Sequence, residues 1–232
     1  MPKNSAVTVT MDVAKQPAHQ SVYEQLRDQI LFGELAPGQA VTIQGITDAL
    51  GAGMTPVREA IRRLTSDGAL NMMGNRRAMV PELTERCIEE LDFMRKCFEP
   101  ELAARAIPNI RPEVLRALQE EDDALNAAID RGDIRAYLTH NYRFHARIYA
   151  AAEAPIIAET VDRLWLRFGP SLRVVCGRYG TMNLPDKHAD LLDALATGDA
   201  SGARQAMQED VDQGMIQIRG ALQDGTSTMR FD

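Results

Sequence analysis

Residues 53–68, GMTPVREAIRRLTSDG, contain a helix start, an amphipathic helix and a helix stop. Thr55 is expected to cap the helix, and Pro56 to take its first position, where a missing N–H costs nothing. Apolar residues then recur at helical spacing until Gly68 closes the pattern. The same short helix carries three arginines, Arg58, Arg62 and Arg63, although the chain has a formal net charge of −7.

The segments on either side of this helix predict a small helical domain that ends in a hairpin. Residues 21–33 show a helical stripe of apolar residues, and residues 42–53 predict a second, shorter helix. Two apolar stretches around Gly-Asn-Arg-Arg at residues 74–77 are typical of a hairpin. This order of elements describes a winged helix-turn-helix. In that fold the second helix of the pair lies in the DNA major groove, with its N-terminal residues nearest the bases.

From Thr84 onward the sequence is helical throughout. Prolines and glycines divide the helical pattern into about six segments joined by short loops, which predicts an antiparallel bundle. Gly169-Pro170 lies inside one segment, where we expect a kink or a split. The predicted fold class is therefore mainly α, with an N-terminal winged helix-turn-helix and a C-terminal antiparallel α-helical bundle.

The distribution of charge supports two domains with different roles. Residues 20–80 carry six basic and six acidic side chains, whereas residues 81–232 carry a net charge of −8. The less acidic segment is the one expected to meet DNA. We place the winged helix-turn-helix at residues 20–82 and the helical domain at residues 83–223. A disordered tail precedes them at residues 1–19, and a frayed tail follows at residues 224–232.

Cysteine usage and hydropathy indicate the compartment. The three cysteines are odd in number and far apart, which favours a reducing compartment over a disulfide framework. No apolar run approaches the ~18 residues of a membrane span, and the N-terminus lacks the features of a secretion signal. We therefore expect a cytoplasmic protein that does not bind membranes.

Three stretches of the first domain resemble the GntR family of bacterial transcription regulators, namely ILFGELAPGQAV, TPVREAIRRLTSDGAL and GNRRAMV. The second domain is similar to the all-helical ligand-binding domain of the FadR subfamily, called FCD, in MRKCFEPELAARA, NYRFHARIYAAAEAP and KHADLLDALATGDASGARQAMQEDV. Its helix count is similar to that of the VanR-type branch. The resemblance covers roughly residues 20 to 222. It implies a homodimeric regulator, most often a repressor, that binds double-stranded operator DNA and a small carboxylate effector.

The resemblance also implies which side chains contact DNA. The family reads bases with residues at the helix start, which correspond here to Gly53, Met54, Thr55 and Pro56. Arg58 and Gln44 match further contacting positions, and the other candidates are Arg62, Arg76 and Arg77, the last two at the wing tip. In the alternative interpretation, the helix arginines form a solvated face with Glu59.

Met54 departs from the family pattern. An arginine is common at this position and can read a guanine edge by two hydrogen bonds, which a methionine cannot do. Either the operator differs from the family's usual one, or Met54 contacts a thymine methyl group.

A second candidate site consists of Asn141, His145, His188 and Asp210. Many members of the subfamily bind a divalent metal through an aspartate and a histidine four residues apart, together with two further histidines. By motif position Asn141 replaces the aspartate and Asp210 replaces the last histidine, while His145 and His188 match. Two imidazoles, a carboxylate and a weak amide ligand would suit Zn²⁺ or Ni²⁺. In the alternative interpretation, the histidines hydrogen bond to Asn141 and Asp210 without a metal.

An effector is expected beside these four residues, inside the bundle. Arg95 matches a family position whose side chain enters the pocket, where an arginine suits a carboxylate; the alternative is a surface ion pair with Glu99. Two rival functions remain open, a metal-responsive sensor and a metal-dependent hydrolase with an accessory DNA-binding module. We expect no enzyme, because the sequence has neither an H-E-x-x-H motif nor a nucleophile elbow.

Overall fold

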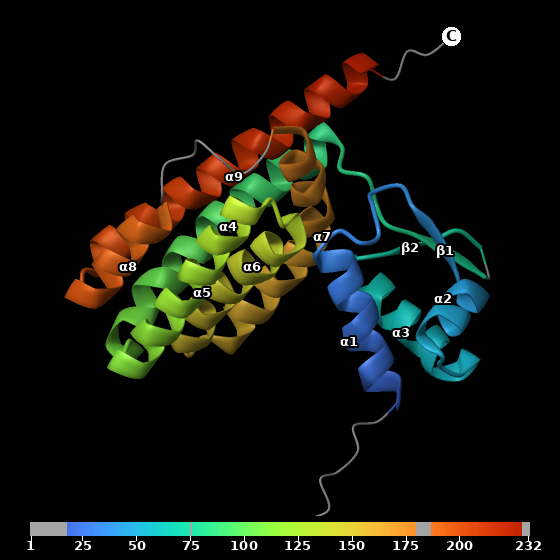
Figure 1. The fold of residues 1–232 in the computed structure, drawn as a ribbon, viewed down its shortest axis with the longest axis horizontal. Helices are drawn as coiled ribbons and strands as arrows, with labels where there is room; N and C mark the ends of the chain where they lie inside the picture. The colour runs from blue at the N-terminus through green and yellow to red at the C-terminus, as the bar shows by residue number, and fades with distance from the viewer. Residues whose placement is uncertain (1–17, 75, 180–186, 229–232) are drawn as a thin grey trace, which may run out of the picture.

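The computed structural model describes residues 18–74, 76–179 and 187–228. These residues are mainly helical and contain one small sheet. Figure 1 shows the later helices gathered in a bundle, beside a smaller unit formed by the first helices and the strands. None of the described helices combines the length and apolarity needed to cross a bilayer.

The smaller unit is a winged helix-turn-helix. Its elements are α1 (Ala18–Leu31), β1 (Ala40–Thr42), α2 (Ile43–Leu50), α3 (Met54–Ser66), β2 (Asn71–Met72) and β3 (Arg77–Met79). The strands form an antiparallel sheet in the order β1-β3-β2, in which Ala78 of β3 lies opposite Val41 and Met72. β2 and β3 are the predicted hairpin, and β1 is a third strand that pairs with β3. The winged helix-turn-helix is therefore confirmed.

The two helices of the helix-turn-helix begin differently. Thr42 caps α2 through its hydroxyl group, whereas α3 begins at Met54 with Gly53 at the N-cap and no side-chain hydrogen bond. The prediction that Thr55 caps α3 and that Pro56 takes its first position is therefore wrong. Pro56 is the third residue of α3. It is tolerated there because the N–H groups of the first turn have no partner within the helix.

The larger unit is a bundle of α-helices. In the described residues they are α4 (Glu85–Ala106), α5 (Pro112–Arg131), α6 (Ile134–Ala151), α7 (Pro155–Tyr179), α8 (Lys187–Thr197) and α9 (Ala200–Thr228), with a short 3-10 turn, η1 (Ile107–Asn109), after α4. Ion pairs between Lys96 and Asp212 and between Glu101 and Arg204 show that α4 and α9 run antiparallel. The predicted bundle is confirmed, and α9 continues past the boundary predicted at residue 223.

The sequence predicts a kink or a split at Gly169-Pro170, and α7 passes through this dipeptide as one helix, so it is not split there. A proline inside a helix removes a backbone hydrogen bond and costs about 3 kcal/mol. Phe168 and Val175, on the two sides of Pro170, are both buried. Tertiary packing on both sides of the proline therefore holds the helix together.

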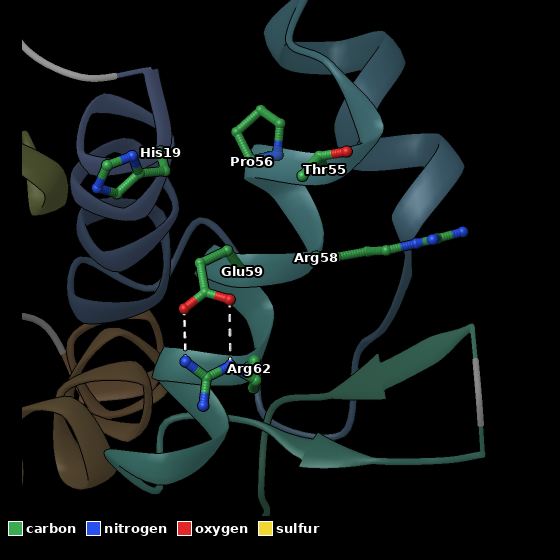
Figure 2. Close-up of a pocket in the computed structure, with 6 residues that line it drawn as sticks. All are labelled: His19, Thr55, Pro56, Arg58, Glu59 and Arg62. Carbon is green, nitrogen blue, oxygen red and sulfur yellow. Dashed lines mark hydrogen bonds and ion pairs between the residues drawn. The ribbon is translucent and has the colours of Figure 1, made fainter.

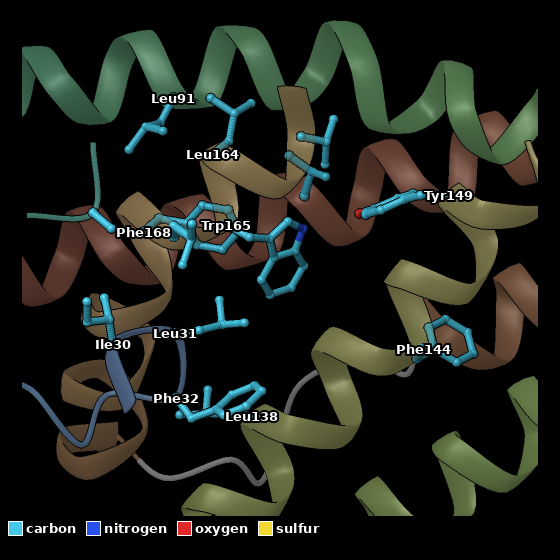
Figure 3. Close-up of a cluster of buried hydrophobic side chains, with 14 of the residues drawn as sticks. Ile30, Leu31, Phe32, Leu91, Leu138, Phe144, Tyr149, Leu164, Trp165 and Phe168 are labelled. Atoms are coloured by element: carbon cyan, nitrogen blue, oxygen red, sulfur yellow. The ribbon is translucent and has the colours of Figure 1, made fainter. Parts of the chain in front are cut away.

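α7 lies against α1 and joins the two units (Figure 1). The end of α1 and the next residue supply Leu31 and Phe32 to a hydrophobic cluster that also contains Trp165 and Phe168 of α7 (Figure 3). Gly169 makes a very close approach, because a Cβ atom built there would lie 2.7 Å from the Leu31 carbonyl oxygen. The two helices can meet at this distance only because residue 169 has no side chain.

A polar contact lies beside this apolar one. The Nη2 group of Arg27 on α1 donates hydrogen bonds to the hydroxyl oxygen of Tyr142 on α6, at 2.7 Å, and to Oδ1 of Asp162 on α7, at 2.5 Å. The Tyr142 hydroxyl donates to the same carboxylate oxygen. Burial, aided by Asp162, raises the pKa of Tyr142, so its hydroxyl keeps the proton that it donates. Three helices from both units therefore meet at one guanidinium group.

Replacing Gly169 with alanine is expected to destabilise the fold by about 1–3 kcal/mol, because the added methyl group overpacks the contact with Leu31. Thermal unfolding followed by circular dichroism would measure this as a lower Tm. Gly220→Ala is the matched control: Gly220 also lies in a helix, but an added Cβ meets nothing within 4 Å there, so its Tm should stay or rise. Equal Tm values for the two variants would contradict the close approach of α1 and α7.

Candidate nucleic-acid interface and buried histidine cluster

α3 turns one face into the core and presents the other to solvent. Its buried residues are Val57, Ala60, Ile61 and Leu64. Met54, Arg58 and Arg62 are exposed. Figure 2 shows the Arg58 side chain extended away from α1, on the side of α3 that faces the hairpin. The amphipathic pattern of the sequence is thus what leaves this arginine accessible.

Residues of β1, α2, α3 and the hairpin meet at one arginine-lined hollow. It is lined by Thr42, Ile43, Gln44, Met54, Arg58, Arg76 and Arg77. A second hollow, which shares Arg58, is lined by His19, Thr55, Pro56, Arg58, Glu59 and Arg62 (Figure 2). The structure therefore brings together the side chains predicted to contact DNA, and Gly53 is exposed at the N-cap of the same helix.

The arginines of α3 differ in what they contact. Arg62 donates two hydrogen bonds to Glu59, of 2.5 and 3.1 Å, which is the ion pair expected in the alternative interpretation of this helix. The guanidinium carbon of Arg63 lies 3.7 Å from the ring centroid of Tyr23, so Arg63 ties α3 to α1. No residue in the described ranges pairs with the guanidinium of Arg58. Arg58 is therefore available to bind a phosphate or a base.

A second cluster lies inside the bundle, where His145 of α6, His188 of α8 and Asp210 of α9 meet. One donor atom of each lies within 4.8 Å of the others. His145 is 1% exposed, and its Nε2 lies 3.3 Å from Oδ2 of Asp210. Three of the four predicted metal ligands are thus brought together. The fourth, Asn141, lies one turn before His145 on α6 and is half-buried.

The Asp210 carboxyl group faces several positive or protonatable groups. Burial alone would raise its pKa, but the facing His145, His188 and Arg95 lower the pKa to about 2. Asp210 is therefore ionised at neutral pH. As an anion it can accept a hydrogen bond from an imidazole or coordinate a metal ion.

Asp122 of α5, which sequence reasoning missed, positions His188. Its Oδ1 lies 2.9 Å from Nδ1 of His188, and both side chains are buried. In the tautomer protonated at Nδ1, His188 donates to Asp122 and leaves Nε2 free, an arrangement common among metal-binding histidines. The sequence held a signal, because Asp122 shares a helical face with Leu118 and Leu125, and an acid on an apolar face needs a partner.

Arg95 is buried beside the cluster. Its Nε donates to Oε1 of Glu99 at 2.5 Å, and Glu99 also accepts a hydrogen bond from the Tyr149 hydroxyl at 2.7 Å. The guanidinium carbon lies 4.0 Å from the ring centroid of Phe168. The alternative of an ion pair with Glu99 is confirmed, but its surface position is wrong, because aromatic side chains enclose both charges. Additional hydrogen bonds such as that from Tyr149 offset the cost of burying an ion pair.

The histidine cluster fits a divalent cation. Two imidazoles and a carboxylate from three different helices form a donor set that suits Zn²⁺. His145 offers Nε2 to the cluster, 3.3 Å from Asp210 Oδ2, and its Nδ1 has no hydrogen-bond partner among the described residues, so no protein group competes for this ring. His145, His188 and Asp210 would hold the ion.

Comparisons with known proteins identify the family. Residues 18–80 match the family described as bacterial regulatory proteins, gntR family, and residues 90–213 match the FCD domain. The chain is 32% identical over 191 residues to the HTH-type transcriptional regulator McbR of Escherichia coli K12, which covers 81% of this chain and 86% of that protein. It is 23% identical to the HTH-type transcriptional repressor RspR of the same organism, over 88% and 91% of the two chains.

A solved structure agrees with the sequence matches. The structure of E. coli McbR/YncC superposes with a TM-score of 0.83 at 30% identity, covering 89% of this chain and 99% of that one. The gntR match coincides with the winged helix-turn-helix and describes regulatory proteins, and the FCD match lies within the bundle. The chain therefore belongs to the GntR family of bacterial transcription regulators that bind DNA through a winged helix-turn-helix, and its second domain is an FCD domain.

Proposed function

We propose that the chain is a ligand-responsive repressor that acts as a cytoplasmic homodimer. Residues 20–82 bind double-stranded operator DNA, and residues 83–223 bind the effector and join the two copies. The observation that supports this most is the arginine-lined hollow, where residues of α2, α3 and the hairpin share one exposed surface. Repression is proposed from the similarity to RspR, which is named a repressor.

For DNA binding, α3 enters the major groove with its N-terminal end first. Gly53, Met54, Thr55 and Pro56 then lie nearest the base edges, next to Gln44 of α2. The arginines contact phosphates or guanine edges from α3 and from the hairpin, through Arg58, Arg62, Arg76 and Arg77. A homodimer would hold two half-sites about one helical turn apart.

For effector binding, we assign a small carboxylate to the region around His145, His188 and Asp210. A Zn²⁺ or Ni²⁺ ion, when bound, supplies positive charge that a carboxylate oxygen can coordinate. Asp210 neutralises part of that charge, and Asp122 keeps His188 in position. Asn141 adds a weak amide ligand, and Arg95, whose charge acts on Asp210, completes the effector site.

The coupling between the sites runs through α6 and α7 to α1. The ring centroid of Trp165 lies 5.4 Å from those of both His145 and Tyr142. The Tyr142 hydroxyl in turn contacts Arg27 of α1 and Asp162 of α7. A ligand that displaces His145 therefore acts on side chains that anchor the DNA-binding unit. It changes operator affinity only if it binds one arrangement of the units better, by a coupling of about 1–3 kcal/mol.

A metal-responsive sensor is the second candidate function. Both histidines of the cluster are buried, so an ion alone could change how α6, α8 and α9 pack. Operator binding measured with and without a chelator, in the absence of any organic ligand, distinguishes the two candidates. Loss of the DNA response on chelation alone would favour the sensor.

Arg58→Ala is expected to weaken operator binding about tenfold, because it removes an exposed guanidinium group from the DNA-facing side of α3. Fluorescence anisotropy with a duplex from a promoter that the protein occupies would measure this at fixed salt, and the salt dependence should also become shallower. Arg105→Ala is the control, because Arg105 is exposed on α4 and pairs with Glu101. Unchanged affinity in Arg58→Ala would contradict the proposed placement of α3.

Asp122→Asn is expected to lower Zn²⁺ affinity about 10–100-fold, because His188 loses its anionic partner. Isothermal titration calorimetry would measure this, and His188→Ala should abolish binding. Glu121→Gln is the matched control, since Glu121 is the adjacent buried acid of α5 but pairs with His140 and Arg147. Equal affinity in the two acid variants would remove the role of Asp122, and a native chain that takes up no Zn²⁺ would remove the metal.

Tyr142→Phe is expected to reduce the response of operator affinity to Zn²⁺ while leaving Zn²⁺ affinity unchanged. The variant keeps the ring beside Trp165 but loses the hydroxyl that contacts Arg27 and Asp162. Anisotropy titrations with operator, at saturating Zn²⁺ and with chelator, would measure the response. Thr139→Val removes a hydroxyl from the same helix as a control, because among the described residues the Thr139 hydroxyl hydrogen bonds only to a backbone carbonyl oxygen one turn before it. A full response in Tyr142→Phe would exclude this route between the sites.

A further inference from the structure

Met54 is an exposed apolar side chain on an otherwise polar DNA-facing surface. It is the first residue of α3 and is 45% exposed. Around the same hollow, Gln44 and the guanidinium groups of Arg58, Arg76 and Arg77 supply hydrogen-bond donors. Met54 has no donor and only a weak acceptor in its thioether sulfur. Its contact with a partner in this hollow must therefore be apolar.

The folded chain does not use Met54 as a core residue. The buried side chains of α3 begin at Val57 and continue with Ala60, Ile61 and Leu64. The core of the winged unit therefore closes without Met54, and its side chain stays uncovered in the free protein. Since methionine is unbranched and flexible at three bonds, it can adapt to the shape of a surface that it meets.

The major groove presents one apolar group to such a side chain. Guanine, cytosine and adenine present hydrogen-bonding atoms there, whereas thymine adds its C5-methyl group. Residues at the N-terminal end of a recognition helix lie nearest the base edges. We propose that Met54 is a specificity-determining residue, which selects a T·A pair in each operator half-site by packing on the thymine methyl group. This inference rests on the proposal that α3 enters the major groove.

The cations around Met54 and the methionine itself contribute differently to DNA binding. Arg58 lies one turn further along α3, and Arg76 and Arg77 approach from the hairpin. Where these arginines contact phosphates, they hold the backbone of any sequence, and those contacts carry no information about bases. The selectivity at the Met54 position therefore comes from the methyl group. Removal of that one group should change the affinity without changing the phosphate contacts.

A methyl-by-methyl scan of the operator tests this inference. The protein first selects duplexes from a random pool, and each thymine of a selected operator is then replaced singly by deoxyuridine, which keeps its base pairing but lacks the methyl group. We expect one position in each half-site where the replacement weakens binding of the native chain about fourfold, the value for burial of one methyl-sized group. At that position Met54→Ala should be insensitive to the replacement, and Met54→Leu should retain most of the effect.

The same position offers a second, independent measurement. Replacing the T·A pair by 5-methylcytosine·G restores a methyl group at the same place in the groove, so the native chain should bind this duplex more tightly than the C·G duplex. Met54→Ala should bind the two duplexes equally. All titrations are made at one salt concentration, and circular dichroism verifies that each variant is folded.

Two kinds of result would contradict the inference, one against the role of Met54 and one against the placement of α3. A flat deoxyuridine scan, or the same loss in native chain and Met54→Ala, overturns the role of Met54. The Arg58→Ala variant separates this failure from failure of the proposed function. If α3 enters the groove, Arg58→Ala must bind every duplex of the scan more weakly than the native chain does. If Arg58→Ala binds normally, or if the native chain selects no duplex, the placement of α3 fails and the inference fails with it.

Discussion

The approach of Gly169 to the Leu31 carbonyl sets the distance between α7 and α1, and the link between the two units depends on that distance. Because α7 comes so close, Arg27 can reach Tyr142 and Asp162 at the same time. A larger residue at position 169 would separate the helices and lengthen both polar contacts. A missing side chain therefore allows a charged contact, and that contact fixes the DNA-facing unit against the bundle.

The interior of the bundle contains pairs of ionisable side chains where apolar side chains would pack more simply. Arg95 is enclosed with Glu99, and His188 is enclosed with Asp122. Buried pairs of this kind contribute little net stability, because desolvation offsets most of their attraction. In a medium of low dielectric, however, each charge acts strongly on its neighbours, as the low pKa of Asp210 illustrates. The interior of the bundle is therefore better suited to respond to an added charge, such as a bound ion, than to provide stability alone.

Much of the fold could be predicted because its signals are local. Turn glycines such as Gly51 and Gly68, both with positive φ, mark helix ends in the sequence itself. The partners of buried charges are not local: Asp122 meets His188 across 66 positions, and no spacing rule connects them. The surface position in the alternative interpretation of Arg95 is wrong for the same reason, since its ion pair with Glu99 is local but the aromatic rings that enclose it come from α7.

Trp165 lies between the histidine cluster and the contact with α1, and it is the only tryptophan of the chain. Indole emission depends on polarity and on nearby protonated or metal-bound groups, so the tryptophan fluorescence of the unlabelled protein originates at the junction of both domains. Trp165 can thus report, by its fluorescence, the binding of a ligand in the bundle at the position where that binding would act on the winged unit. Candidate small molecules could be screened by emission alone, before any promoter is known.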